Sequence, residues 1–318
     1  MTYAVTIHEN RVPPASRVCC CHLPHTLKKV VCDIQQFAHG ILGRQAIPAS
    51  KVSAEHFNQW RRQIFDSNST SDLLHYTPQN FRLTTAQGTE ISAIKLQRNP
   101  HLPSKRCILF AGGSGTPCEE SLVKGSLVQL VACLEADLVT YNHPGVNDPS
   151  VWPSRQGMKE RLEACVEFIQ KDPQVEVIVI GFSMGGAVAL EAAIKVHLIV
   201  ADRTFGCFSD AVRSATKSRI LECAAKVFGW NLSPKDAIKQ IKSPVVVLQS
   251  AHSCHYERIY EDEKIKNDGI IFPSDTLAQH VDKERTSVFG IPDNHDFGWK
   301  SPHQIALIIE RYLNRDML

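Results

Sequence analysis

Apolar and polar positions along most of this chain follow the pattern of short strands that alternate with longer amphipathic helices. Apolar runs typical of strands occupy residues 81–87, 89–97, 107–113, 137–143, 175–183, 198–205, 244–250 and 287–292. Helical periodicity occupies residues 119–135, 154–171, 184–196, 208–242 and 302–312. This alternation predicts an α/β fold with an eight-stranded, mostly parallel sheet flanked by helices.

The N-terminal quarter of the chain has a different pattern. Apolar residues recur at three- and four-residue spacing over 27–42, which predicts one amphipathic helix. A second helix is predicted from Ser50, as its N-cap, to Phe65. The predicted organisation is an N-terminal helical appendage over residues 1–77 and a main domain over residues 78–318, with a small helical cap at about 206–232.

The composition narrows the range of functions. Hydrophobic residues make up 43% and charged residues 21% of the 318 positions, as in an ordinary globular protein. The formal charge of +2 creates no long-range field that would hold nucleic acid, so no nucleic-acid partner is expected. The 11 cysteines are an odd number, which excludes a disulfide framework closed entirely within the chain.

No membrane-spanning or secretory segment is expected. The most apolar long window, residues 175–193, contains Glu176, Ser183 and Glu191, and it predicts a strand, a turn and a helix. The first residues lack a basic segment followed by an apolar run, so the pattern of a signal peptide is absent. The expected location is therefore the cytoplasm.

The strongest chemical motif is Gly181-Phe182-Ser183-Met184-Gly185, which fits G-x-S-x-G. A predicted buried strand precedes it and a predicted helix of small residues follows it, so Ser183 lies on the sharp turn between them. The hydroxyl is also at a helix N-terminus, whose field favours developing negative charge. The motif therefore predicts a nucleophilic serine.

At this motif the chain resembles the α/β-hydrolase superfamily, over roughly residues 78–318. The stretch IVIGFSMGGAVAL is similar to many serine esterases and peptidases, and LFAGGSGTPCEESL, YNHPGV and ADRTF are similar to a bacterial group from chlamydiae and legionellae. The resemblance implies the α/β-hydrolase fold and a triad in the chain order serine, acid, histidine. The bacterial group also implies a second location, a host cytoplasm reached without a signal peptide.

The resemblance places the histidine after the last strand, where the chain has Asp293-Asn294-His295-Asp296. His295 is the predicted general base, because a hydroxyl is a weak nucleophile until an imidazole accepts its proton.

The acid is less clearly marked, because no aspartate directly follows the strand at 244–250. Asp268-Gly269-Ile270-Ile271 is similar to the family's acid turn, so Asp268 is the predicted acid, at the end of an insertion of about fifteen residues. Asp202 after the strand at 198–205 and Asp262 remain open as alternatives.

An oxyanion hole needs two backbone N–H donors. One is predicted at Met184, directly after the serine, and the other at Gly113, beside Ser114 in the glycine-rich loop after the third strand. This loop lacks the His-Gly-Gly-Gly sequence of one esterase group.

Two cysteine-containing clusters remain, Cys19-Cys20-Cys21-His22 and Cys254 between His252 and His255. Neither has a second pair of ligands at zinc-binding spacing, so no metal is expected. The first cluster lies beside a predicted helix that carries Lys28 and Lys29, so an alternative is S-acylation and peripheral membrane association through the N-terminal segment.

These features predict a serine hydrolase that cleaves a carboxylic ester or thioester by a Ser-His-Asp triad through an acyl-enzyme, with a small-molecule or acylated substrate and no cofactor. Two alternatives stay open. One is a peptidase or acyltransferase on the same fold. The other is a non-catalytic, membrane-docked binding protein, which the unusual acid loop would suit.

Overall fold

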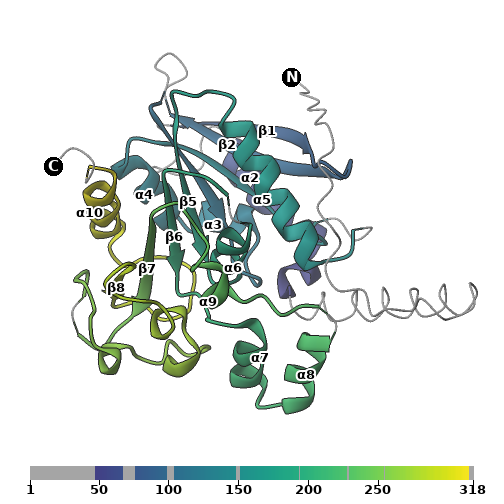
Figure 1. The fold of residues 1–318 in the computed structure, drawn as a ribbon. Helices are drawn as coiled ribbons and strands as arrows, with labels where there is room; N and C mark the ends of the chain where they lie inside the picture. The colour runs from purple at the N-terminus through teal and green to yellow at the C-terminus, as the bar shows by residue number, and fades with distance from the viewer. Residues whose placement is uncertain are drawn as a thin grey trace, which may run out of the picture.

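The computed structural model describes residues 47–66, 76–98, 104–147, 151–192, 194–227, 229–253 and 255–314. Within them, one eight-stranded sheet runs through the molecule (Figure 1). Its strands are β1 (Tyr76–Thr84), β2 (Glu90–Arg98), β3 (Arg106–Ala111), β4 (Asp137–Tyr141), β5 (Glu176–Phe182), β6 (Leu198–Asp202), β7 (Val245–Ser250) and β8 (Ser287–Ile291). The predicted eight-stranded sheet is confirmed, and β1 begins two residues before the predicted domain boundary at residue 78.

The strand order is β1-β2-β4-β3-β5-β6-β7-β8. The hairpin strand β2 pairs antiparallel with both β1 and β4, and all pairings among β3 to β8 are parallel. Because parallel strands all end at the same edge, the loops that follow β3, β5, β6, β7 and β8 gather at one end of the sheet.

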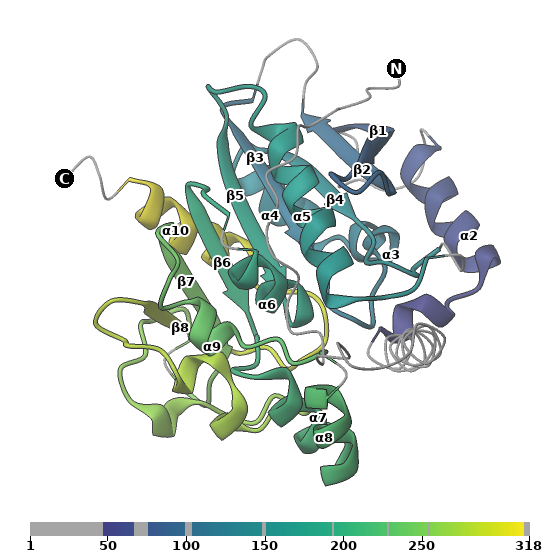
Figure 2. The ribbon, with the colours of Figure 1, turned by 45° about the vertical axis from the view of Figure 1, so that its right-hand side comes forward.

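Helices cover both faces of the sheet (Figures 1 and 2). Helices α5 (Arg155–Ile169) and α6 (Met184–Glu191) pack on the face that receives Val177 and Val179 of β5. Helices α4 (Ser126–Cys133) and α10 (Pro302–Leu313) pack on the face that receives Ile178 and Ile180. Both faces of the sheet are therefore buried from solvent, which explains the continuous apolar runs of the central strands.

The predicted single helix over 119–135 is wrong. The chain forms α3 (Cys118–Val123) and α4, and Gly125 between them has a φ of 84°. A positive φ cannot continue a right-handed helix, and glycine adopts it without a Cβ clash. The helix axis therefore changes direction after α3.

The predicted helical stretch over 208–242 is also divided. It forms α7 (Phe208–Thr216), α8 (Arg219–Val227) and α9 (Pro234–Ala237). Lys217, in the left-handed conformation, ends α7, and Pro234 begins α9 as its first residue. α7 and α8 stand side by side as the predicted small cap (Figure 2), and α8 exposes Ile220, Leu221 and Val227.

Residues 47–66 of the predicted N-terminal appendage pack directly on the main domain. Ile47 and Phe57 belong to the buried core, and Arg61 forms an ion pair with the fully buried Glu119 of α3. Ser50 is not the helix cap. The helix α2 spans Ala54–Phe65, and the side chain of Ser53 caps it by accepting from the backbone N–H of His56. The predicted helix over 27–42 lies outside the described residues.

The insertion between β7 and the predicted acid follows the free edge of the sheet. The backbone N–H groups of Tyr256 and Ile259 donate to carbonyls of β8, and the N–H of Gly290 in β8 donates to Glu257. The segment then returns to β7, where the N–H of Lys266 donates to the carbonyl of Ser250, the last residue of that strand, at 3.0 Å. The insertion therefore covers β8 and brings the chain back to the end of the strand that it left.

None of the helices in the described ranges combines the length and the apolar character that crossing a bilayer requires.

The turn at Gly125 yields a stability prediction. Gly125→Ala should lower the free energy of unfolding by about 1–2 kcal/mol, because alanine is strained at this positive φ. Urea denaturation followed by circular dichroism measures the change. Gly115→Ala is the control, since its added methyl meets no atom within 4 Å and its φ is not positive. Equal losses in both variants would contradict the explanation.

Candidate active site

Ser183 lies between β5 and α6 in a strained backbone conformation. It has φ 52° and ψ −112°, a region that residues other than glycine rarely adopt. Its backbone N–H donates to the carbonyl of Asp202 at 2.8 Å, and its side chain is partly exposed. The turn therefore presents the hydroxyl at the carboxyl end of the sheet.

Two neighbouring glycines make this turn possible. A Cβ at Gly185 would lie 2.0 Å from the carbonyl oxygen of Ala111, and a Cβ at Gly181 would lie 2.5 Å from Gly186. Such distances exclude any side chain, so the first turn of α6 can approach β3 and β5 only because both positions are glycine.

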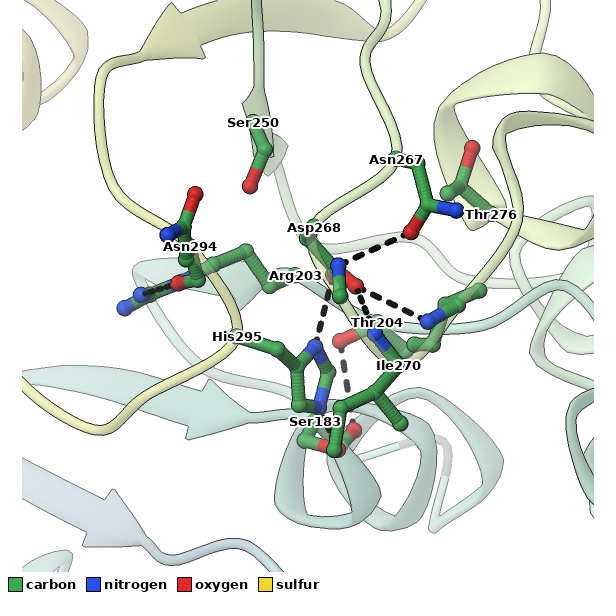
Figure 3. A network of polar contacts seen from close by, with 12 residues as sticks. Ser183, Arg203, Thr204, Ser250, Asn267, Asp268, Ile270, Thr276, Asn294 and His295 are labelled. Atoms are coloured by element: carbon green, nitrogen blue, oxygen red, sulfur yellow. Dashed lines mark hydrogen bonds and ion pairs between the residues drawn. The ribbon is translucent and has the colours of Figure 1, made fainter. Parts of the chain in front are cut away.

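Three predicted residues meet at this turn (Figure 3). The Oγ of Ser183 lies 2.9 Å from Nε2 of His295, and Nδ1 of His295 lies 2.6 Å from Oδ2 of Asp268. With the imidazole neutral, the serine hydroxyl donates to Nε2 and the Nδ1–H donates to the carboxylate. The structure thus brings together residues that are separated by 112 and 27 positions in the chain.

Asp268 is held in its turn by two further donors. Its Oδ1 accepts from the backbone N–H of Ile271 at 2.8 Å and of Ile270 at 3.0 Å, and its own carbonyl accepts from the N–H of His295 at 2.8 Å. Burial alone would raise the pKa of Asp268, but the hydrogen bond and the charge of His295, together with these N–H groups, lower it below its usual range. The carboxylate therefore stays ionised and keeps the imidazole oriented.

The two alternative acids lie elsewhere. Asp202 has a fully buried side chain, and it pairs with Arg203 at 2.7 Å and accepts from Nε1 of Trp299 at 3.0 Å. Asp262 is half exposed and forms an ion pair with Lys283. Of the three candidate acids, Asp268 is the one that the structure places against the imidazole of His295.

The predicted oxyanion donors flank Ser183. A Cβ on Gly113 would lie 3.6 Å from Cβ of Ser183 and 2.9 Å from the Phe182 ring, so this loop faces the nucleophile at close range. Met184 is the first residue of α6, where helix geometry leaves N–H groups without an intrahelical acceptor. The loops after β3 and β5 lead to helices on opposite faces of the sheet.

His143 supports the same loop, and it was not among the predicted site residues. Its Nε2–H donates to the carbonyl of Gly112 at 2.8 Å, and its side chain is buried. Burial lowers the pKa of His143 to about 4, so it is neutral at pH 7. Its signal in the sequence was its position at the carboxyl end of β4, beside the glycine-rich loop.

Among the described residues, no group of three or more His, Cys, Asp or Glu side chains could hold a metal ion. Cys19, Cys20, Cys21 and Cys254 of the two cysteine clusters lie outside them. A hydroxyl, an imidazole and a carboxylate in series can by themselves remove the proton of the hydroxyl.

Comparison with known proteins identifies one family and a set of similar structures. A family model described as Chlamydia CHLPS protein (DUF818) matches residues 30–294. No curated protein sequence matches the chain.

Several solved structures resemble this one. The Pyrococcus furiosus esterase Pf2001 matches with a TM-score of 0.56 and 15% identity, over 78% of this chain and 96% of that one. The 2,6-dihydroxy-pseudo-oxynicotine hydrolase matches with a TM-score of 0.55 and 17% identity, over 91% of this chain and 83% of that one. The esterase domain of a Rhodothermus marinus protein matches with a TM-score of 0.52 and 12% identity, over 75% of this chain and 99% of that one.

The buried His143 predicts a pH dependence of stability. Its pKa is about 4 in the folded protein against 6.5 for a free histidine, so the unfolded chain binds the proton first as pH falls. Above pH 6.5 the titration of this residue therefore does not lower the free energy of unfolding. By pH 4 it lowers the free energy of unfolding by about 3 kcal/mol. Urea denaturation of wild type and His143→Gln across this range measures it. Equal pH slopes in the two proteins would contradict a buried neutral imidazole.

Proposed function

This chain belongs to the Chlamydia CHLPS protein (DUF818) family and has the α/β-hydrolase fold, and on this basis we propose that it is a serine hydrolase. The observation that carries the proposal is the hydrogen-bonded series from Ser183 Oγ through His295 to Asp268, at 2.9 and 2.6 Å. The names of the similar structures, two esterases and a hydrolase, agree with it.

The first half-reaction forms an acyl-enzyme. Ser183 Oγ attacks the carbonyl carbon of an ester or thioester while His295 Nε2 accepts the hydroxyl proton. Asp268 stabilises the imidazolium, and the N–H groups of Met184 and Gly113 bind the oxygen that becomes negative. When the carbonyl re-forms, the bond to the alkoxide or thiolate breaks, and His295 gives its proton to that leaving group.

The second half-reaction releases the acyl group. His295 takes a proton from water, whose oxygen attacks the acyl carbon, and returns a proton to Ser183 Oγ as the carboxylic acid leaves. A peptidase or an acyltransferase would use the same residues with a different leaving group or acceptor, so the fold alone does not separate these activities.

An apolar acyl group suits the surroundings of the site. Ile270 and Phe272, two and four residues after Asp268, are both exposed. Apolar side chains that are exposed beside a catalytic loop gain free energy when an apolar substrate covers them. A panel of esters and thioesters of increasing acyl length tests this preference. Membrane association through the N-terminal segment stays a prediction.

Replacement of the nucleophile tests the proposal directly. Ser183→Ala should abolish labelling by a fluorophosphonate probe and hydrolysis of p-nitrophenyl esters, because no other oxygen lies within reach of His295 Nε2 in the described contacts. Gel fluorescence and the release of p-nitrophenol measure the two effects. Ser53→Ala, at the exposed cap of α2, should label like wild type. Labelling that persists in Ser183→Ala would contradict the proposal.

The identity of the acid is tested separately. Asp268→Asn should lower kcat by about 10⁴-fold at pH 7, since an amide favours the wrong imidazole tautomer and cannot stabilise its charge. Asp262→Asn is the matched control, an exposed aspartate that pairs with Lys283, and it should keep the wild-type kcat. A large loss in Asp262→Asn with none in Asp268→Asn would move the acid to residue 262.

A further inference from the structure

The guanidinium of Arg203 lies fully buried next to the loop that carries His295 (Figure 3), and every one of its N–H groups has an acceptor. Nε donates to Oδ1 of Asp202 at 2.9 Å and Nη2 to Oδ2 of Asp202 at 2.7 Å. The other three N–H groups donate to main-chain carbonyls, those of Asn294, of Asp296 at 2.8 Å and of Gly298 at 3.2 Å. A guanidinium has five N–H donors, so this side chain is saturated.

The three carbonyls belong to residues before and after His295 in the chain. Asn294 precedes His295 directly, Asp296 follows it directly, and Gly298 lies two positions further on. The segment contains no helix or strand of its own, so it lacks the internal hydrogen bonds that would fix its backbone. Arg203 donates to three of the loop's carbonyls, more than any other side chain: Ser250 Oγ donates to the carbonyl of Asp293 at 2.6 Å, and Lys266 Nζ donates to the carbonyl of Pro292 at 3.3 Å. The indole of Trp299 adds a bond to Asp202.

The segment at the carboxyl end of β6, residues 202–204, also holds the nucleophile. The carbonyl of Asp202 accepts from the N–H of Ser183 at 2.8 Å, and Oγ1 of Thr204 donates to the carbonyl of Ser183 at 3.3 Å. Arg203 itself has a φ of 45°, a conformation that costs free energy in any residue with a side chain. One short segment thus fixes the backbone at both partners of the 2.9 Å contact between Ser183 and His295.

We propose that Arg203, held by Asp202, is a positioning residue that fixes the His295 loop against Ser183; this role rests on the proposed hydrolase function. Proton transfer needs the imidazole within hydrogen-bond reach of the hydroxyl, and a displacement of about 1 Å can lower the rate about 100-fold. Lysine keeps the charge but carries three donors at one point, so it cannot span a carboxylate and three separated carbonyls.

The test compares Arg203→Lys with wild type on a short p-nitrophenyl ester. The expected result is a kcat lower by about 100-fold with KM nearly unchanged, because the substrate pocket is intact while the base is displaced. The rate of fluorophosphonate labelling should fall in parallel. Where Arg203→Lys fails to fold, the double variant Asp202→Asn with Arg203→Gln removes both charges, leaves no unpaired buried ion and should show the same loss.

The matched control is Arg106→Lys. Arg106 forms ion pairs with Glu176 and Glu310, but it is the first residue of β3, at the amino end of the strand, whereas the site lies at the carboxyl end. This variant should lower the unfolding temperature and keep the wild-type kcat. A folded Arg203→Lys with wild-type kcat, or an equal loss of kcat in Arg106→Lys, would overturn the positioning role alone. Labelling that persists in Ser183→Ala would overturn the hydrolase function, and the positioning role with it.

Discussion

The close approach between the first turn of α6 and the central strands is the constraint on which the rest of the site depends. A side chain at Gly185 would collide with the main chain of β3, and one at Gly186 would lie 2.0 Å from Oγ1 of Thr204 after β6. Since the helix starts this close to the sheet, the chain must turn sharply at Ser183, which accepts a positive φ of 52°. Every other element of the site is placed relative to that turn. The glycine-rich loop faces it from β3, and the end of β6 is hydrogen-bonded to its N–H and carbonyl groups.

Two buried aspartates near this turn have different roles because their neighbours differ. The side chains of Asp202 and Asp268 are both fully shielded from solvent. Asp202 pairs with the guanidinium of Arg203. Both groups stay charged, because an unpaired charge in the protein interior costs several kcal/mol of free energy. Asp268 meets the imidazole of His295 at 2.6 Å and two backbone N–H groups that favour the ionised form of the carboxylate. The first aspartate therefore suits a structural anchor, and the second suits the orientation of the imidazole in the proposed mechanism.

The long insertion before Asp268 is a structural solution to an exposed sheet edge. Strand β8 ends the sheet, and residues 255–259 cover it with main-chain hydrogen bonds before the chain returns to Ser250. An uncovered edge strand offers unpaired N–H and carbonyl groups to other chains, so this cover protects against edge-to-edge association. The acid turn is distant along the chain from β7 but lies only two residues after Lys266, which is bonded to the end of that strand.

The sequence by itself determined the order of strands and helices, the mostly parallel sheet and the glycine-flanked serine, because these depend on local periodicity and on short-range steric limits. It also predicted Ser183 and His295, and Asp268 with Asp202 and Asp262 as alternatives, and the catalytic roles of these residues stay predictions. It did not determine where helices break, since the positive φ at Gly125 and Lys217 depends on packing. It could not show which aspartate contacts His295, or assign partners to Arg203 and His143, since those contacts join residues as many as 95 positions apart. Only the tertiary structure decided them, because a buried polar group takes whichever partner the folded chain brings within reach.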